Sequence, residues 1–458
     1  MRNAAGIFCV ALLVRVAYIF LFVAPEHLGA EDQLLYLSMA QSIMTNGFTV
    51  TTTERVSGYP LFLSSVFFLF GQGQYGLLGV QAVIDSATCV CVGRLAHVAL
   101  GRGFLFAGLL AAANLNMVIL SAMVLTDSLF LCLFTLFLLF LIRFLHGRKS
   151  SDYAWCLSFL VLATAIRSAS YYLVPCIMLA LVFWSILART TPKRIGFQFL
   201  AGVTIAVVIL GPQHLHNWQK HDTLSYVSQG GTHLLGWVVP ATYQYSGQGS
   251  YQQGQALAHS RLEKAMADDG LSVLPENPFA ASRYRSEIAR QILKDLGWVN
   301  MMKAWTIGAA VNFVTPSAAF APAVRAMDHP SFYETPGVGV LEKLWNYANN
   351  SSGVLYLSIL VVGTLTSLVF FLASLVGWWE TLRGSVAVRS GWAGYGILIF
   401  FTLVIAYFVA VTGPIIGGKY RLPIEPIMTV FVVNAFYRYC RRIKSQGLLD
   451  TPERGMRL

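Results

Sequence analysis

The chain has few charged residues and few cysteines for its length. Only 12% of its 458 residues are charged, whereas soluble proteins have about 25%. The seven cysteines all lie in or beside apolar runs, and no CxxC pair occurs, so neither a disulfide framework nor a zinc-binding cysteine pair is indicated. These shortages exclude an ordinary soluble domain and a disulfide-stapled secreted one.

Acidic residues are also scarce, with 21 Asp and Glu against 32 Lys and Arg, for a net charge of +11. This excess does not indicate a nucleic-acid binder, because the basic residues form short clusters between apolar runs. Such clusters are typical of the cytoplasmic loops of membrane proteins. The sequence therefore predicts an integral membrane protein with no nucleic-acid partner.

The apolar runs approach the length of about 20 residues that a helix needs to cross a bilayer. They predict ten spans, near 5–23, 76–99, 103–123, 127–146, 152–166, 169–188, 194–213, 353–378, 391–412 and 422–438. The run 58–71 is shorter and is predicted to stay on the outer side. Residues 1–23 resemble a signal peptide but lack a convincing cleavage site, so they are expected to form a retained first span.

With ten spans, the basic clusters fall on one side and both termini are cytoplasmic. The outer side then receives two polar segments, the first outer loop 24–75 and a long region, 214–351. The first should contain an amphipathic helix that ends at Asn46-Gly47. The second should contain helices from Asn277 to Gly297 and from Val299 to Phe313, with loops at Gly230-Gly231 and 243–254.

The same orientation brings ionisable and polar residues to the outer ends of several spans, where they could share one cavity. This set comprises Glu31, Asp32, Asp127, Arg167, His214, His216, Asn217, Lys419 and Arg421. Asp85 instead lies in the middle of a span and is expected to pair between helices.

These residues occur in motifs that resemble the C superfamily of glycosyltransferases, in particular its protein O-mannosyltransferases and lipid A aminoarabinose transferases. The resemblance covers 1–220 and 350–440. It is carried by Asp32-x-x-x-Tyr36-x-x-x-Ala40, Arg55-x-x-Gly58-Tyr59-Pro60, Leu125-Thr126-Asp127-Ser128, the Arg167 turn, Gly211-Pro212-x-x-x-x-Asn217 and Tyr420-Arg421-Leu422-Pro423. The chain departs from the family where Glu31-Asp32 replaces Asp-Glu, where Asp127 replaces Glu and where His216 replaces an arginine.

The resemblance implies an all-α polytopic fold of about ten membrane helices, with interfacial helices in the first outer loop and a long, partly helical outer loop. Its catalytic part would be an N-terminal module, 1–213, followed by the outer region 214–351, the C-terminal helices 352–440 and a cytoplasmic tail, 441–458. It also implies an inverting transfer of a sugar from a polyprenyl-phosphate donor to an envelope lipid, glycan or protein, on the periplasmic face of a bacterial inner membrane.

Such a transfer needs a base on the acceptor hydroxyl and cations on the departing phosphate. Asp32 is the candidate base, with Glu31 as the alternative. Asp127 would orient the acceptor or a metal, unless it merely caps its helix. The candidate phosphate ligands are Arg167, Lys419 and Arg421, which could instead extend toward lipid headgroups, together with Arg55, which could instead pair with Glu54.

The remaining candidates would line the substrate cavity: Tyr36, Tyr59, His214, His216, Asn217 and Tyr420. Carboxylates with two histidines could hold a divalent metal, but no spacing demands one and no cofactor is indicated. A secondary transporter or a lipid or glycan flippase is the alternative function. The gathering of ionisable residues at one face, with no visible duplication, favours the transferase.

Overall fold

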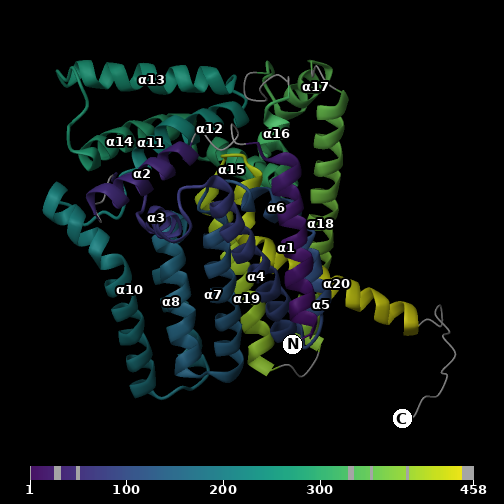
Figure 1. Cartoon of the computed structure of the whole chain (residues 1–458). Helices are drawn as coiled ribbons and strands as arrows, with labels where there is room; N and C mark the ends of the chain where they lie inside the picture. Colours follow the sequence, from purple (N-terminus) through teal and green to yellow (C-terminus); the bar gives the residue numbers. More distant parts are fainter. Residues whose placement is uncertain are drawn as a thin grey trace, which may run out of the picture.

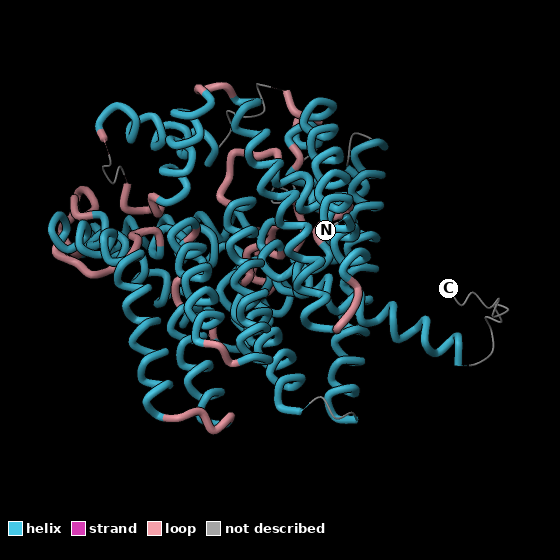
Figure 2. The backbone as a smooth tube through the Cα atoms, turned by 60° about the horizontal axis from the view of Figure 1, so that its bottom comes forward, coloured by secondary structure: helices cyan, strands magenta, loops and turns pink. Residues whose placement is uncertain are grey.

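The computed structural model describes residues 2–24, 32–47, 52–327, 335–350, 354–387 and 391–445. These residues form helices joined by short loops, and they contain no strand (Figure 2). The predicted all-α fold is therefore confirmed.

A bundle of mostly upright helices forms the body of the molecule (Figure 1). Its members are α1 (Arg2–Phe22), α4 (Gln74–Leu100), α5 (Phe104–Ala112), α6 (Leu115–Ser121), α7 (Asp127–Gly147), α8 (Ser150–Ile166), α9 (Leu173–Leu187), α10 (Pro192–His221), α18 (Val354–Ala387), α19 (Gly391–Thr412) and α20 (Glu425–Ser445). Every predicted span coincides with one of these helices or with a pair of them.

Among the described residues, seven helices are long and apolar enough to cross a membrane, and the bent pair α5 and α6 would make eight. The protein is thus a multi-pass membrane protein. The helices at the other two predicted spans are not among these: α8 is only 17 residues long, and α20 is less apolar, so their crossing of the membrane stays a prediction.

The predicted span 103–123 is not one straight helix, because α5 and α6 meet at an angle of 54°. Asn114 explains the break. Its side chain accepts a hydrogen bond from the backbone N–H of Met117 at 3.2 Å and so caps a new helix. It also donates to the buried carboxylate of Glu425 on α20 at 2.7 Å, which fixes the break inside the bundle.

The helix at the predicted span 194–213 is longer than that span, because α10 continues to His221 with Pro212 inside it. Asn217 stabilises the added turns. This residue is fully buried and donates to the backbone carbonyls of Ser225 and Tyr226 at 2.8 and 3.0 Å. The chain that follows α10 is therefore tied back against the helix.

A layer of helices covers one end of the bundle, opposite the end where the N-terminus lies (Figure 1). It comprises α2 (Asp32–Asn46), α3 (Gly58–Phe70), α11 (Gly230–His233), the π-helix η3 (Leu234–Val238), α12 (Val239–Tyr245), α13 (Tyr251–Asp268), α14 (Pro278–Leu296), α15 (Trp298–Val314), α16 (Pro322–Arg325) and α17 (Val340–Asn350). Both predicted polar segments thus contribute to the same end.

The helix boundaries predicted in this layer are largely confirmed. Gly47, at a φ of +74°, follows the end of α2 at Asn46. Asn277 caps α14 by accepting from the backbone N–H groups of Phe279 and Ala280. Gly297, at a φ of +85°, separates α14 from α15.

The loop predicted at Gly230-Gly231 is wrong, because 230–245 is helical, and the loop predicted at 243–254 is confirmed only for 246–250, since α13 begins at Tyr251. Gly231 lies where α11 packs closely against α14, and a Cβ on it would clash with the carbonyl oxygen of Ser282. Ser250 and Gln253 form a capping box that starts α13. These glycine and polar residues therefore serve helix packing and capping.

Asp85 pairs between helices as expected. Its carboxylate accepts from the Nε of Arg15 on α1 at 2.5 Å, and both side chains are buried, at 1% and 0% exposure. Arg15 also donates to the carbonyl of Ala112 at 3.0 Å, where α5 ends. This ion pair joins three helices inside the bundle.

Candidate functional site

Asp32, the candidate base, begins α2 and lies beside Arg55. The Nη2 of Arg55 donates to its Oδ1 at 3.1 Å, with the Asp32 side chain 41% exposed and that of Arg55 19% exposed. Arg55 thus pairs with Asp32 and not with Glu54. Glu31, the alternative base, lies outside the described residues.

Two contacts position Arg55. The loop that carries it is tied to the outer region, where Ser228 donates its backbone N–H to the Thr53 carbonyl at 2.8 Å. Gly58 then begins α3 so close to α8 that a Cβ would lie 2.3 Å from the Ala165 carbonyl oxygen. The Arg55-x-x-Gly58 motif therefore holds α3 against the end of α8, two residues before Arg167.

One nitrogen of Arg55 has no acceptor. Its Nη1 is buried and finds no hydrogen-bond partner among the described residues. Buried guanidinium nitrogens are almost always hydrogen-bonded in proteins. This atom is therefore available to an anionic group that binds beside Asp32.

Asp127 and Arg167 form a second ion pair between the start of α7 and the end of α8. Asp127 is 3% exposed and its carboxylate bonds to the Nη1 of Arg167. The carboxylate is thus engaged by the arginine and does not act as a helix cap. The Arg167 guanidinium also lies 5.9 Å from the ring centre of Phe130.

Tyr36 connects the two pairs. Burial raises the pKa of its phenol, Arg55 and Arg167 act to lower it, and Asp32 and Asp127 act to raise it. All four charged groups thus lie within electrostatic reach of one hydroxyl. This arrangement gathers residues from α2, the loop before α3, the start of α7 and the end of α8, as the motifs predicted.

Tyr59 packs against Tyr36 on the buried side of this centre. Its ring meets that of Tyr36 edge to face, with centroids 5.2 Å apart, and its hydroxyl donates to Gln81 at 2.7 Å. Because Tyr59 is 0% exposed, it does not line a substrate cavity, and that expectation is corrected.

Lys419 and Tyr420 approach the same centre from the loop between α19 and α20. The Arg167 pKa is raised, because Asp127, Tyr420 and Tyr36 outweigh the opposite effect of burial, so Tyr420 lies within reach of Arg167. The ammonium of Lys419 lies 5.7 Å from the Tyr420 ring centre. It makes no hydrogen bond or ion pair with the described residues, which leaves its charge free for a ligand.

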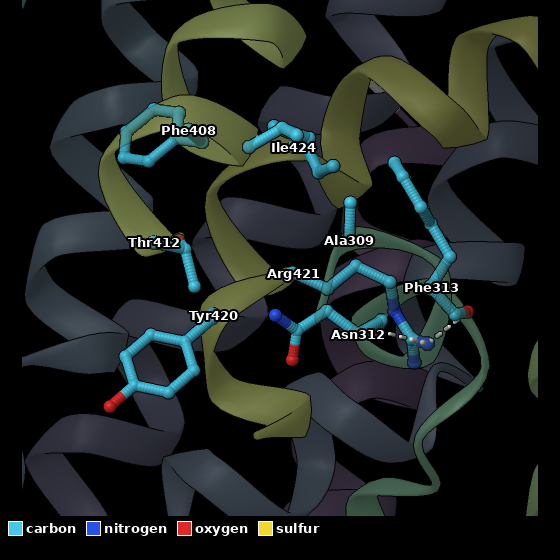
Figure 3. Close-up of a pocket in the computed structure, with 9 residues that line it drawn as sticks. Ala309, Asn312, Phe313, Phe408, Thr412, Tyr420, Arg421 and Ile424 are labelled. Atoms are coloured by element: carbon cyan, nitrogen blue, oxygen red, sulfur yellow. Dashed lines mark hydrogen bonds between the residues drawn. The ribbon is translucent and has the colours of Figure 1, made fainter. Parts of the chain in front are cut away.

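A small, mainly apolar pocket with a volume of about 20 Å³ adjoins Tyr420 (Figure 3). It lies between α15, α19 and the chain before α20. Its lining includes Ala309, Phe313, Phe408, Val409, Thr412 and Ile424. A volume of this size holds about one water molecule, so the pocket takes neither a sugar nor an isoprenyl unit in this conformation.

Arg421 is not available as a phosphate ligand, contrary to expectation. Its guanidinium is 5% exposed, pairs with Glu425 at 2.9 Å and donates to the Phe313 carbonyl at 2.6 Å. Figure 3 shows this group turned toward Asn312 and Phe313, away from the Tyr420 ring. Each of its three nitrogens has an acceptor in the protein.

The three polar residues near the end of α10 form a separate group. His214 contacts the Leu224 carbonyl at 2.7 Å and packs against the rings of Tyr171 and Tyr226. The side-chain amide of Asn217 is buried and donates to backbone carbonyls, so its predicted place in the cavity is wrong. His216 has no contact with Asp32 or Arg55, and its predicted role stays a prediction.

His233 at the end of α11 lies near Arg55, a proximity that the sequence did not reveal. Burial, and then the charge of Arg55, lower the pKa of its imidazole. It therefore lies within electrostatic reach of Arg55. The residues Gly230-Gly231 before it were interpreted as loop, and nothing local links this histidine to the first outer loop.

No group of three or more His, Cys, Asp or Glu side chains suited to a metal occurs in the described part of the chain. Asp32 and Asp127 are each engaged by an arginine instead. The residues present therefore suit an anion better than a divalent cation.

Comparisons with known proteins agree with this architecture. Residues 56–216 match the family model of the dolichyl-phosphate-mannose-protein mannosyltransferases. The oligosaccharyltransferase of Archaeoglobus fulgidus, solved in the apo form, has a similar fold, with a TM-score of 0.52 and 14% identity over 97% of this chain. The chain spans about half of its length, 51%.

ArnT from Cupriavidus metallidurans, solved bound to undecaprenyl phosphate, aligns over 98% of this chain and 81% of its own at 12% identity, with a TM-score of 0.38. No functionally curated protein matches the chain. The superfamily resemblance in the sequence is thus confirmed: the chain is similar to the C-superfamily glycosyltransferases in fold and, over 56–216, in sequence.

Proposed function

We propose that this protein is an inverting glycosyltransferase that moves a sugar from a polyprenyl-phosphate donor to a hydroxyl of an envelope lipid, glycan or protein. The observation that carries the proposal is the meeting of the Asp32–Arg55 and Asp127–Arg167 pairs around Tyr36, with one buried Arg55 nitrogen unpartnered. The match of 56–216 to a mannosyltransferase model supports glycosyltransferase activity.

Asp32 would act as the base. Arg55 occupies its Oδ1, and the side chain remains 41% exposed, so Oδ2 can accept the proton of an acceptor hydroxyl. That hydroxyl oxygen then attacks the anomeric carbon as the bond to the phosphate breaks, which inverts the configuration. General-base catalysis of this kind contributes about 10²–10⁴-fold to a rate.

The leaving phosphate would be held by cations. Its second pKa is about 6, so it departs without a strong acid and needs only charge stabilisation. Arg55 can donate through Nη1, Lys419 offers an unpaired ammonium, and Arg167 adds a charge held in place by Asp127. Asp127 thus serves as the positioning partner of Arg167.

We place the protein in a bacterial inner membrane with this site on the periplasmic side. The support is that α2, α3 and the outer region share the end of the bundle opposite the basic clusters (Figure 1).

The test is transfer of a labelled sugar by purified protein in detergent. It should be supplied with a panel of polyprenyl-phosphate sugars and with acceptors extracted from cell envelopes. A glycosylated product that appears only with a lipid-phosphate donor would support the proposal. Reconstituted protein that moves the lipid sugar across vesicles, with no product across the panel, would favour a transporter instead.

A further inference from the structure

A cluster of three arginines lies at the opposite end of the bundle from Asp32. Arg102 connects α4 to α5, and Arg438 and Arg441 belong to α20. The Arg102 guanidinium carbon lies 4.8 Å from the ring centre of Tyr437. Burial, and the charges of Arg441 and Arg438, lower the Arg102 pKa, so the three charges lie within reach of one another.

Two glycines allow this cluster to form. A Cβ on Gly103, which has a φ of +84°, would lie 2.5 Å from Cγ1 of Val433. A Cβ on Gly384 of α18 would lie 2.5 Å from Nη2 of Arg438. The missing side chains let the start of α5 and α18 approach α20 closely, so Arg102 and Arg438 are partly buried, while Arg441 remains exposed.

Two nitrogens of the cluster lack acceptors. The Nε atoms of Arg102 and Arg438 are buried and have no hydrogen-bond partner among the described residues. A nearby ion pair joins Arg442 to Glu380 at 2.7 Å, and it involves neither Arg102 nor Arg438. Like charges held together with buried, unpartnered N–H groups leave a place for an anion.

We propose that Arg102, Arg438 and Arg441 bind a phosphate group, and that its source is the headgroup of an anionic phospholipid. Guanidinium groups match the geometry of phosphate oxygens. The lipid source is favoured because Phe436 and Tyr439, at 47% and 65% exposure, flank the arginines on α20 and can lie along acyl chains. Figures 1 and 2 both show this half of α20 projecting from the side of the bundle.

This site is separate from the proposed donor site, and it does not depend on the proposed function. The experiment measures retention of phosphatidylglycerol by native mass spectrometry of purified full-length protein. The variants are Arg438→Gln and Arg441→Gln; Arg441 is exposed, so its substitution should leave folding intact. Lys193→Gln is the control, because it removes one exposed charge at the same end of the bundle, at the start of α10.

Wild type and Lys193→Gln should retain the lipid, and each arginine variant should bind it about tenfold or more weakly. Inorganic phosphate, tested against chloride at equal ionic strength, separates the two sources. Stabilisation by phosphate that the arginine variants lose, without selective lipid retention, would support the anion site but assign it to a soluble phosphate. Equal lipid retention and equal phosphate response in all four proteins would overturn the proposal.

Discussion

Lys419 and Arg421 are two residues apart, yet the structure gives them opposite roles, and their glutamine variants should fail differently. Arg421 is 5% exposed and pairs with Glu425, which is 1% exposed. The ammonium of Lys419 lies over the ring of Tyr420 and makes no hydrogen bond or ion pair with the described residues. Arg421→Gln should therefore reduce stability, and Lys419→Gln should reduce the use of the donor.

The expected magnitudes differ enough to be measured. Removing one partner of a buried ion pair costs about 3–5 kcal/mol. The lower end applies here, because Asn114 and Asn116 still donate to Glu425, each at 2.7 Å. Loss of the partly exposed cation–π contact of Lys419 costs about 1 kcal/mol. A lost charge-assisted bond to phosphate should weaken donor use roughly tenfold or more.

The assay combines thermal unfolding in one detergent with the dependence of sugar transfer on donor concentration. Arg421→Gln should unfold at a clearly lower temperature, with a near-normal donor KM in the folded fraction. Lys419→Gln should unfold like wild type, with a raised donor KM. The opposite pattern, a stable Arg421→Gln with impaired donor use, would refute the structural role assigned to Arg421.

Three further outcomes follow from other parts of the molecule. Asp85→Asn should destabilise the protein by about 3–5 kcal/mol, and adding Arg15→Met should recover part of that loss; equal melting of the single and double variants would contradict the pairing. The lowered pKa of His233 means that the unfolded chain binds a proton first, so stability should fall as pH drops below about 6.5, and His233→Gln should flatten this part of a pH–Tm profile. A cysteine at Gln72 should react with an impermeant reagent added outside cells; reaction only after permeabilisation would refute the predicted topology.

The fold was predictable to a large extent because hydropathy and basic clusters act locally along the chain. Each predicted span coincides with helix, and helix ends at Asn46-Gly47 and Asn277-Pro278 follow from capping. The break at Asn114 was not predictable from apolar length, because it depends on a contact with Glu425 from the other end of the sequence. Segments with many glycines were misjudged for a similar reason, since Gly231 serves helix contact.

The site was predictable in part. Motif spacing identified Asp32, Arg55, Asp127 and Arg167, and the structure brings them together. The sequence could not separate Lys419 from Arg421. The local turn decides which of these two nearby cations points into the protein, and the turn cannot be predicted from the motif. His233 could not be found either, since only tertiary structure brings α11 near Arg55.

The most direct test of the central claim is sugar transfer by Asp32→Asn, measured together with donor binding. Asn keeps the shape and an acceptor oxygen for Arg55 but cannot take a proton. Asp152→Asn is the matched control, because Asp152 pairs with Arg143 at 3.0 Å at the other end of the bundle.

Asp32→Asn should bind the donor like wild type and transfer sugar about 10²–10⁴-fold more slowly, while Asp152→Asn transfers normally. Near-normal transfer by Asp32→Asn would contradict the assignment of Asp32 as the base.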